Sequence, residues 1–133
     1  MNYYLDTDIC IFILKGQFPA IKKWFQASQP DHIKIPSIVQ SELLLGALKS
    51  ANPKETVHLI ERFLEPYEIV SFNAQAAIAY ARIRHQLEKS GKSIGPNDLI
   101  IAATVAAHQG TLITHNTKEF NRVPGIIIED WTV

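Results

Sequence analysis

Short apolar runs, separated by longer segments of helical periodicity, make up the pattern of hydrophobic and polar positions along this chain. Five runs are rich in Ile, Val, Leu and Tyr, and they predict β-strands at residues 2–5, 32–35, 68–72, 111–114 and 126–129. Strands that alternate with helices favour a parallel sheet with helices on both faces. We therefore predict an α/β fold, an α/β/α sandwich with a central parallel sheet of about five strands. The last run, Ile126-Ile127-Ile128, is continuously apolar, as in a strand covered on both faces.

Helix start and stop signals divide the segments between these runs. Ser37 and Gln40 have the spacing of a capping box, which predicts a helix running towards Lys49. Asn73 predicts the start of a long helix that ends at Gly91. Residues 37–64 as a whole favour a pair of helices that stands off the sheet.

One further helix is predicted to be buried. It opens at Gly95-Pro96-Asn97, because proline is favoured in the first turn. Residues 99–107 are apolar nearly all round, which indicates a helix enclosed by the rest of the fold. We expect Gly110 to end it.

Length and composition narrow the class of protein. With 133 residues the chain can bury a real core, so we predict a single domain over residues 1–133. Cys10 is the only cysteine, which excludes an internal disulfide and fits a reducing, cytoplasmic location. No signal peptide is visible, and no apolar stretch approaches the ~20 residues of a membrane span.

The charge balance argues against a simple basic nucleic-acid binder, because 13 basic and 13 acidic residues leave a formal net charge of zero. The balance changes if four acids hold metal, since the 13 basic residues then face only nine acidic ones. A neutral total therefore does not exclude RNA as a ligand.

Acidic and amide side chains recur where the predicted strands end. Asp6 directly follows the first strand, and Asn116 and Glu119 follow the fourth. Glu42 and Asp98 lie in the first two turns of predicted helices. Because ligands of open parallel sheets bind beyond the carboxyl ends of the strands, we expect these side chains to share one site.

Carboxylates that converge in this way cannot all remain charged and unpaired. Mg²⁺, or Mn²⁺, resolves the conflict because hard divalent cations prefer oxygen ligands. The expected metal ligands are Asp6, Glu42 and Asp98. A bound metal lowers the pKa of its water and stabilises charge on a phosphate oxygen, which is the chemistry of phosphodiester hydrolysis.

Each of these residues also has a purely structural interpretation. Asp6 could simply end its strand, and Glu42 could be a solvated helix residue. Asp98 could favour a helix N-terminus through the helix dipole. Asn116 and Glu119 have the spacing of a helix-capping pair. From spacing alone, the shared location of the acids is a stronger signal than any one of them.

Four short motifs, in this order, resemble those of PIN-domain nucleases: Tyr4-Leu5-Asp6-Thr7-Asp8, Ser41-Glu42-Leu43-Leu44-Leu45-Gly46-Ala47, Gly95-Pro96-Asn97-Asp98-Leu99-Ile100-Ile101-Ala102-Ala103 and Thr114-His115-Asn116-Thr117-Lys118-Glu119-Phe120. The ending is similar to that of VapC toxins, especially the branch that cleaves initiator tRNA; it runs from Arg122-Val123-Pro124-Gly125-Ile126 to Glu129-Asp130-Trp131. The resemblance covers the whole chain.

This resemblance implies a Mg²⁺-dependent endoribonuclease that hydrolyses RNA, with tRNA, and initiator tRNA in particular, as the expected substrate. It also implies a homodimer inhibited by a VapB-like antitoxin, so that the chain would be the toxin of a type II toxin–antitoxin system. It carries Asp6, Glu42 and Asp98 over as the acidic core.

Other positions of the resemblance are auxiliary or divergent. Asn116 falls where many relatives have Asp, and Glu119 matches a further acidic position. Thr7 and Thr114 match hydroxyl positions beside the acids. The chain departs from the family pattern at two positions, Asp8, where Asn is more usual, and His115, where Asn or Asp is more usual.

Some residues near these motifs are expected to be structural. Asp8, judged by its own surroundings, is expected to be a helix cap, and Cys10 a core residue. The histidines at positions 58, 85, 108 and 115 share no metal-binding spacing and are expected on the surface or in packing.

Two rival functions fit parts of the sequence. Asp6-Thr7-Asp8 has the Asp-x-Asp form of haloacid dehalogenase-like phosphatases, which use an aspartyl nucleophile. That motif normally continues to Thr or Val where this chain has Cys10, and the chain is short for that family. A non-catalytic RNA- or protein-binding module on the same fold is the second rival, because a fold alone does not establish a function. The retained acids argue against it.

The sequence also suggests which residues bind RNA and which contact a protein partner. Once metal neutralises the acids, basic residues must hold the RNA backbone, and the candidates beside the motifs are Lys49, Lys92, Lys118 and Arg122. An exposed apolar patch marks an interface, and the helices within residues 37–64 carry Ile38, Leu44, Leu48, Val57, Ile60 and Leu64. Whether these apolar residues face a partner or the core is open from the sequence. An antitoxin could also place an Arg among the carboxylates.

Overall fold

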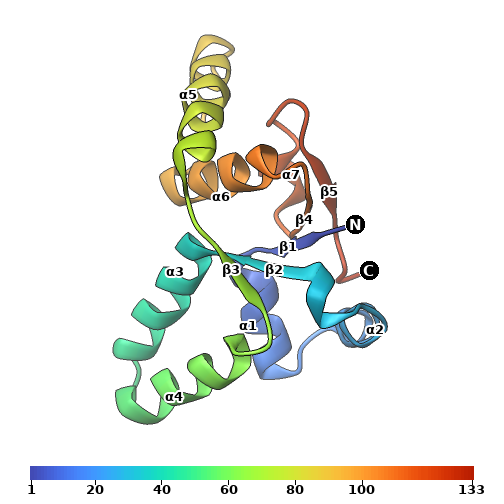
Figure 1. Ribbon diagram of the computed structural model, residues 1–133, viewed down its shortest axis with the longest axis vertical. Helices are drawn as coiled ribbons and strands as arrows, with labels where there is room; N and C mark the ends of the chain where they lie inside the picture. Colours follow the sequence, from blue (N-terminus) through green and yellow to red (C-terminus); the bar gives the residue numbers. More distant parts are fainter.

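Five parallel strands form one central sheet in the order β3-β2-β1-β4-β5 (Figure 1), in a computed structural model that describes residues 1–133. The strands are β1 (Tyr3–Leu5), β2 (Ile33–Pro36), β3 (Glu68–Val70), β4 (Thr111–Ile113) and β5 (Ile127–Glu129). All five predicted strands are present, and their ends lie within two residues of the predicted ones. The all-parallel pairing confirms the predicted α/β architecture.

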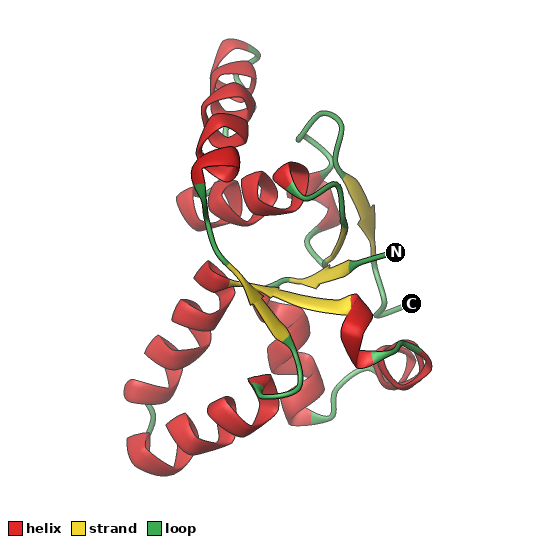
Figure 2. Cartoon of the chain, viewed as in Figure 1, coloured by secondary structure: helices red, strands yellow, loops and turns green.

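Seven α-helices connect and cover the strands. They are α1 (Thr7–Lys15), α2 (Pro19–Ala27), α3 (Ser37–Leu48), α4 (Pro53–Leu64), α5 (Ala74–Lys89), α6 (Pro96–Ala107) and α7 (Thr117–Phe120), with a short 3-10 turn, η1 (Pro30–His32), before β2. In Figure 2 the α5–α6 pair lies above the sheet, and α1 and α2 lie below it. The α3–α4 pair extends to the lower left, as the sequence predicts for residues 37–64. None of the helices has the length and apolar character needed to cross a membrane.

The centre of the sheet is the most deeply buried part of the fold. Tyr3 of β1 lies opposite Ile33 of β2 and Thr111 of β4, so β1 is paired on both sides. Tyr4 and Leu5 are buried because helices cover both faces there. The chain therefore leaves β1 and β4 at neighbouring points of one sheet edge, which places the residues after Leu5 and after Ile113 together.

Helix α6 is enclosed, as its apolar sequence predicts, with six buried residues between Leu99 and Val105. Its end differs from the prediction. The helix stops at Ala107, and Gln109, with φ 54°, takes the left-handed conformation expected of a glycine. Gly110 is needed for another reason, because a Cβ there would lie 2.2 Å from the Tyr4 ring.

Two other sequence expectations need correction. Asn73 does cap α5, accepting a hydrogen bond from the Ala76 amide at 3.0 Å. Ser37, however, is the first residue of α3 and its side chain caps nothing, because proline precedes it and the helix starts directly from β2. Strand β5 is not covered on both faces; it is an edge strand, and Ile127 is 62% exposed.

Candidate active site

A cavity of about 140 Å³ opens where β1 and β4 end, between the first turns of α1 and α6 and the second turn of α3. Polar oxygens and amides dominate its wall, with two apolar residues at its base, and its lining consists of Asp6, Thr7, Asp8, Glu42, Asp98, Ile101, Asn116 and Phe120. The three acids expected from the sequence, Asp6, Glu42 and Asp98, therefore meet in one place although they come from distant parts of the chain.

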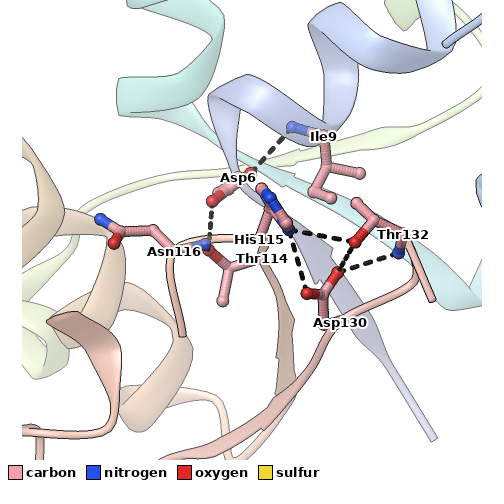
Figure 3. Close-up of polar contacts among 7 residues, drawn as sticks. All are labelled: Asp6, Ile9, Thr114, His115, Asn116, Asp130 and Thr132. Carbon is pink, nitrogen blue, oxygen red and sulfur yellow. Dashed lines mark hydrogen bonds and ion pairs between the residues drawn. The ribbon is translucent and has the colours of Figure 1, made fainter. Parts of the chain in front are cut away.

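Asp6 is the buried member of the group, at 5% exposure. One carboxylate oxygen accepts the Ile9 amide at 2.9 Å and the other accepts the Thr114 hydroxyl at 2.5 Å (Figure 3). Burial raises the pKa of Asp6 to about 6, because these hydrogen bonds only partly offset the loss of solvation. The nearby Asp8 and Glu42 carboxylates add to the rise.

The cap of α1 is Asp6 and not Asp8, which corrects the sequence expectation. Asp6 has the extended backbone of an N-cap residue, and its side chain binds the Ile9 amide three residues on. Asp8 lies within the first turn, where it is exposed and lines the cavity. One carboxylate thus serves both as helix cap and as cavity wall.

Glu42 is held by side chains from two other helices. Its Oε1 accepts the Thr7 hydroxyl at 2.6 Å, and its Oε2 accepts the Asn97 amide at 3.3 Å. Residues 7 and 97 begin α1 and α6, so Glu42 joins three helices at the cavity. A solvated helix residue would have no such partners.

Asp98 lies beside Glu119. A Cβ at Gly95 would be 3.8 Å from Asp98 Oδ2 and 3.8 Å from Glu119 Oε1, so both side chains lie against the same turn. Burial, and then the hydrogen bond and charge of Glu119, raise the pKa of Asp98 to about 7. Partial burial alone would raise the pKa of Glu119, but bonds from the Gly95 amide, Asn116 and Asp98 lower it. Of the two carboxyl groups, Asp98 therefore has the raised pKa and Glu119 the lowered one.

Asn116 and Glu119 do not form the capping pair that their spacing predicts. The Asn116 side chain makes no cap bond to α7; its amide donates instead to Glu119 Oε2 at 3.0 Å. The other oxygen of Glu119 accepts the Gly95 amide at 2.8 Å. Glu119 thus ties α7 to the start of α6 from beside the cavity, while Asn116 lines it.

The donor set fits a hard divalent cation in its chemistry. Carboxylate oxygens from three elements line a small polar cavity, and burial disfavours the negative charge on Asp6 and Asp98. In the structure the acids are held by hydroxyl and amide donors, and no group of three His, Cys, Asp or Glu side chains has the spacing of a formed metal cluster. A cation would have to draw the carboxylates together.

None of the basic candidates lies in the wall of the cavity. Lys49, Lys92, Lys118 and Arg122 are all exposed. Arg122 is the most fixed, because its guanidinium donates to the Ser93 carbonyl at 3.1 Å. The positive charge of Arg122 also lowers the pKa of Glu119, so the guanidinium lies near that carboxylate.

A polar cluster next to the cavity was not predicted from the sequence. His115 Nδ1 lies 3.0 Å from Asp130 Oδ2 and 3.0 Å from the Thr132 hydroxyl (Figure 3). Partial burial would raise the pKa of Asp130, but bonds from Thr132 and His115 outweigh it and lower that pKa. Only the departure of His115 from the family pattern marked this position, since Asp130 lies 15 residues further on.

A parallel α/β sheet with carboxylates gathered at its carboxyl edge fits the class of metal-dependent phosphodiester nucleases. Residues 3–126 match the PIN domain family. The chain belongs to that family and, within it, to the VapC ribonucleases, as the following relatives indicate.

The tRNA(fMet)-specific endonuclease VapC of Salmonella typhimurium is 36% identical over 131 residues, which is 98% of each chain. Ribonuclease VapC2 of Rickettsia felis is 36% identical over 132 residues, again 98% of each chain. Among solved structures, Rickettsia felis VapBC2 bound to a DNA fragment from its promoter matches with a TM-score of 0.92 and 36% identity, over 98% of this chain and 99% of that one. The DNA-bound VapBC of Salmonella typhimurium matches equally well, with a TM-score of 0.92 over 98% of both chains. Family membership favours the nuclease over both rival interpretations.

Proposed function

We propose that this chain is the ribonuclease toxin of a toxin–antitoxin pair and that it cleaves tRNA, with initiator tRNA as its substrate. The observation that carries the proposal is the convergence of Asp6, Glu42 and Asp98 on one cavity at the carboxyl edge of the sheet. The substrate class is supported by the relatives of similar length that are named tRNA(fMet)-specific endonucleases.

PIN-domain ribonucleases depend on divalent metal ions, and we propose Mg²⁺ for this chain, held by Asp6, Glu42 and Asp98. When bound, such an ion lowers the pKa of a water molecule and offsets negative charge on the phosphate. Thr114 and the Ile9 amide fix the orientation of Asp6. Thr7 does the same for Glu42, so these two side chains have a fixed orientation, and the ion would draw the three carboxylates closer together.

Auxiliary roles follow from the contacts around the acids. Asn116 presents its amide group between the cavity and Glu119. Glu119 holds the first turn of α6, and hence Asp98, through the Gly95 amide. Lys49, Lys92, Lys118 and Arg122 are proposed to bind phosphates of the RNA, because they are exposed and flank the acidic motifs in the sequence.

A groove of about 410 Å³ supports an antitoxin partner. It lies between α1, α3 and α4, and its apolar wall includes Ile11, Leu14, Leu43 and Leu59. Glu42 stands at its end and also lines the acidic cavity. An apolar antitoxin segment in the groove would therefore lead directly to the carboxylates, where an Arg side chain would pair with them.

The apolar positions predicted in α3 and α4 divide into three groups. Ile60 and Leu64 are buried in the core of this chain. Ile38, Leu44 and Val57 are partly buried against that core. Leu48, at 62% exposure, remains open, and Leu45 and Leu59 are exposed as well. These side chains support the proposal that the α3–α4 pair takes part in protein contacts, including those of a homodimer.

The test is cleavage of purified total tRNA by the purified chain, with Mg²⁺, with Mn²⁺ and with a chelator. We expect cleavage only with metal, at one position of initiator tRNA, located by sequencing the new RNA ends. The Asp98→Asn variant is the control for a contaminating nuclease. Intact tRNA under all three conditions would contradict the proposal, and cleavage of other RNAs only would contradict its substrate.

A further inference from the structure

Three aromatic rings form a cluster beside the acidic cavity. Phe12 and Phe18 meet edge to face with ring centroids 4.8 Å apart. The His115 ring lies 6.1 Å from Phe12 and 5.6 Å from Phe18. Phe18 is 38% exposed and the His115 side chain 50% exposed, so two of the three rings present surface to solvent. We refer to these residues as the aromatic platform.

The chain connects the platform to the cavity at two points. On α1, Phe12 follows the cavity residue Asp8 by four positions, so it lies on the same face one turn, about 5.4 Å, further along. On the other side, His115 stands between Thr114, which binds Asp6, and Asn116, which lines the cavity. The platform is therefore within reach of a nucleotide whose phosphate lies at the carboxylates.

The conformation of Phe18 is unusual. Its φ of 57° and ψ of 91° lie in a region that bulky residues rarely adopt, and it precedes α2 without capping it by its side chain. Such strain persists where the surroundings hold it, often at ligand sites. Glycine would take this conformation more readily, so an exposed phenyl ring is being kept there at a cost.

Hydrogen bonding orients the third ring. The Thr132 hydroxyl and amide both donate to Asp130 Oδ1, at 2.6 Å and 2.9 Å (Figure 3). Because a carboxylate only accepts, the His115 Nδ1 that faces Asp130 must carry the proton. In the neutral ring Nε2 then offers a lone pair on the opposite side, which suits an amino group of a base or a ribose hydroxyl.

We propose that the aromatic platform binds one unpaired base of the RNA, next to the phosphate that is cleaved. Base stacking on aromatic rings is the usual means of holding single-stranded RNA. A cavity of about 570 Å³ adjoins Phe12 and Phe18, and its exposed rim carries Lys22, Gln17 and Gln26, which suit a phosphate and the edges of a base. The inference rests on the proposed ribonuclease function and adds a determinant of substrate choice outside the acidic site.

The test compares two ligands of equal length, a short single-stranded RNA and a chain with the same backbone but stable abasic residues. Both are bound to the Asp98→Asn variant with chelator present, and affinity is measured by fluorescence anisotropy. Only the RNA can stack, so the ratio of the two affinities isolates the contribution of the bases. We expect the ratio to fall about 5- to 150-fold when a single stacking ring is removed.

Phe18→Gly is the informative variant, because it removes the ring and also relieves the strained backbone. A ring that serves only packing would lower the urea midpoint when lost, and the affinity ratio would not move. Phe18→Tyr should preserve the ratio, since it keeps the ring. Phe72→Ala is the matched control, because Phe72 is also 38% exposed and packs edge to face on Tyr80.

The inference is overturned if Phe18→Gly leaves the ratio unchanged, if both ligands weaken equally, or if Phe72→Ala lowers the ratio as much. Cleavage of tRNA by the unmodified chain is measured alongside. Cleavage together with an unchanged ratio contradicts the platform alone, whereas absence of cleavage contradicts the ribonuclease proposal independently of the binding data.

Discussion

The acidic cavity and the apolar groove share Glu42 and the helices α1 and α3, yet they differ in every other physical respect. The cavity is small and polar. Burial, together with the charges of neighbouring carboxylates, raises the pKa of Asp6 and Asp98. The groove is about three times larger and is lined by Leu and Ile side chains, of which Leu59 is exposed and Ile11 and Leu14 are half-buried.

The two regions therefore favour ligands of opposite character. A positive charge would stabilise the carboxylates of the cavity, and contact with an apolar ligand surface would stabilise the side chains of the groove. A metal ion together with RNA answers the first need only. A peptide that carries both an apolar segment and a guanidinium answers both, which explains how one partner could block the enzyme with modest contact area.

The largest effect is expected from the cavity. Asp6→Asn, Glu42→Gln and Asp98→Asn should each lower the rate of tRNA cleavage with Mg²⁺ by about 10²–10⁴-fold, as for loss of a positioned catalytic group. Asp8→Asn should stay within ~10-fold of the parent, because Asp8 neither caps α1 nor is held by other side chains and Asn suits the first turn nearly as well.

Asp31→Asn, at an exposed carboxylate in η1, is the control for a general effect of charge. Urea midpoints in the presence of chelator separate chemistry from unfolding. For Asp6→Asn the midpoint should rise, because a buried charge is removed. If two of the three cavity variants cleave at the parent rate, the assignment of the metal ligands is wrong.

The groove should give the next largest effect. Leu59→Asp should weaken binding of a VapB-like antitoxin by about 30-fold, the size of a central interface contact, while tRNA cleavage stays unchanged. Leu45→Asp is the matched control, because both leucines are 52% exposed but Leu45 does not line the groove. Calorimetric titration measures the affinity, and equal losses for the two variants would remove the groove from the interface.

A smaller effect is expected from the exposed basic residues Lys118 and Arg122. Binding of RNA to the Asp98→Asn variant should weaken steeply as salt rises, with a slope of about −0.7 for each phosphate contact on a single strand. Lys118→Gln and Arg122→Gln should each make that slope shallower by about one contact. If the affinity of the Asp98→Asn variant for RNA does not change with salt, phosphate-dominated binding is contradicted.

The smallest effect lies outside both regions, at the pair formed by Asp130 and His115. Hydrogen bonds lower the pKa of Asp130 below its ordinary value. The pair therefore stabilises the fold fully at pH values above that ordinary pKa. This contribution should be lost as the pH falls through the lowered pKa, below about pH 4. The difference in urea midpoint between the parent and Asp130→Asn should therefore shrink towards strong acid; a constant difference would contradict the assignment.

Sequence reasoning located the strands and the meeting point of the acids because both depend on chain order and periodicity. Strand ends in a parallel sheet share an edge, so Asp6 and Asn116 had to be near each other once the strands were placed. Long helices with clear signals, such as the one that Asn73 begins, were also predictable.

Contacts between elements were not predictable from local spacing. Asn116 and Glu119 have the spacing of a cap, but the Gly95 amide competes for the Glu119 carboxylate and no local rule includes it. The local sequence predicts that Gly110 ends a helix, whereas the residue must be glycine because a Cβ there would collide with the Tyr4 ring of another strand. The helix that begins after Phe18 was not located individually, because its N-cap has neither a capping side chain nor a favourable φ.

The bond from Thr114 to Asp6 spans 108 residues, and β1 needs β4 as one of its two neighbours. During synthesis on the ribosome β1 can pair with β2 early, but its other neighbour, β4, is among the last segments to emerge. Sheets built on such distant pairings form slowly, because a long loop must close before the contact is made. An unfinished chain that ends before β4 therefore contains Asp6, Glu42 and Asp98 but lacks Thr114, so the hydrogen bonds that fix the acidic cavity are complete only when translation is nearly finished.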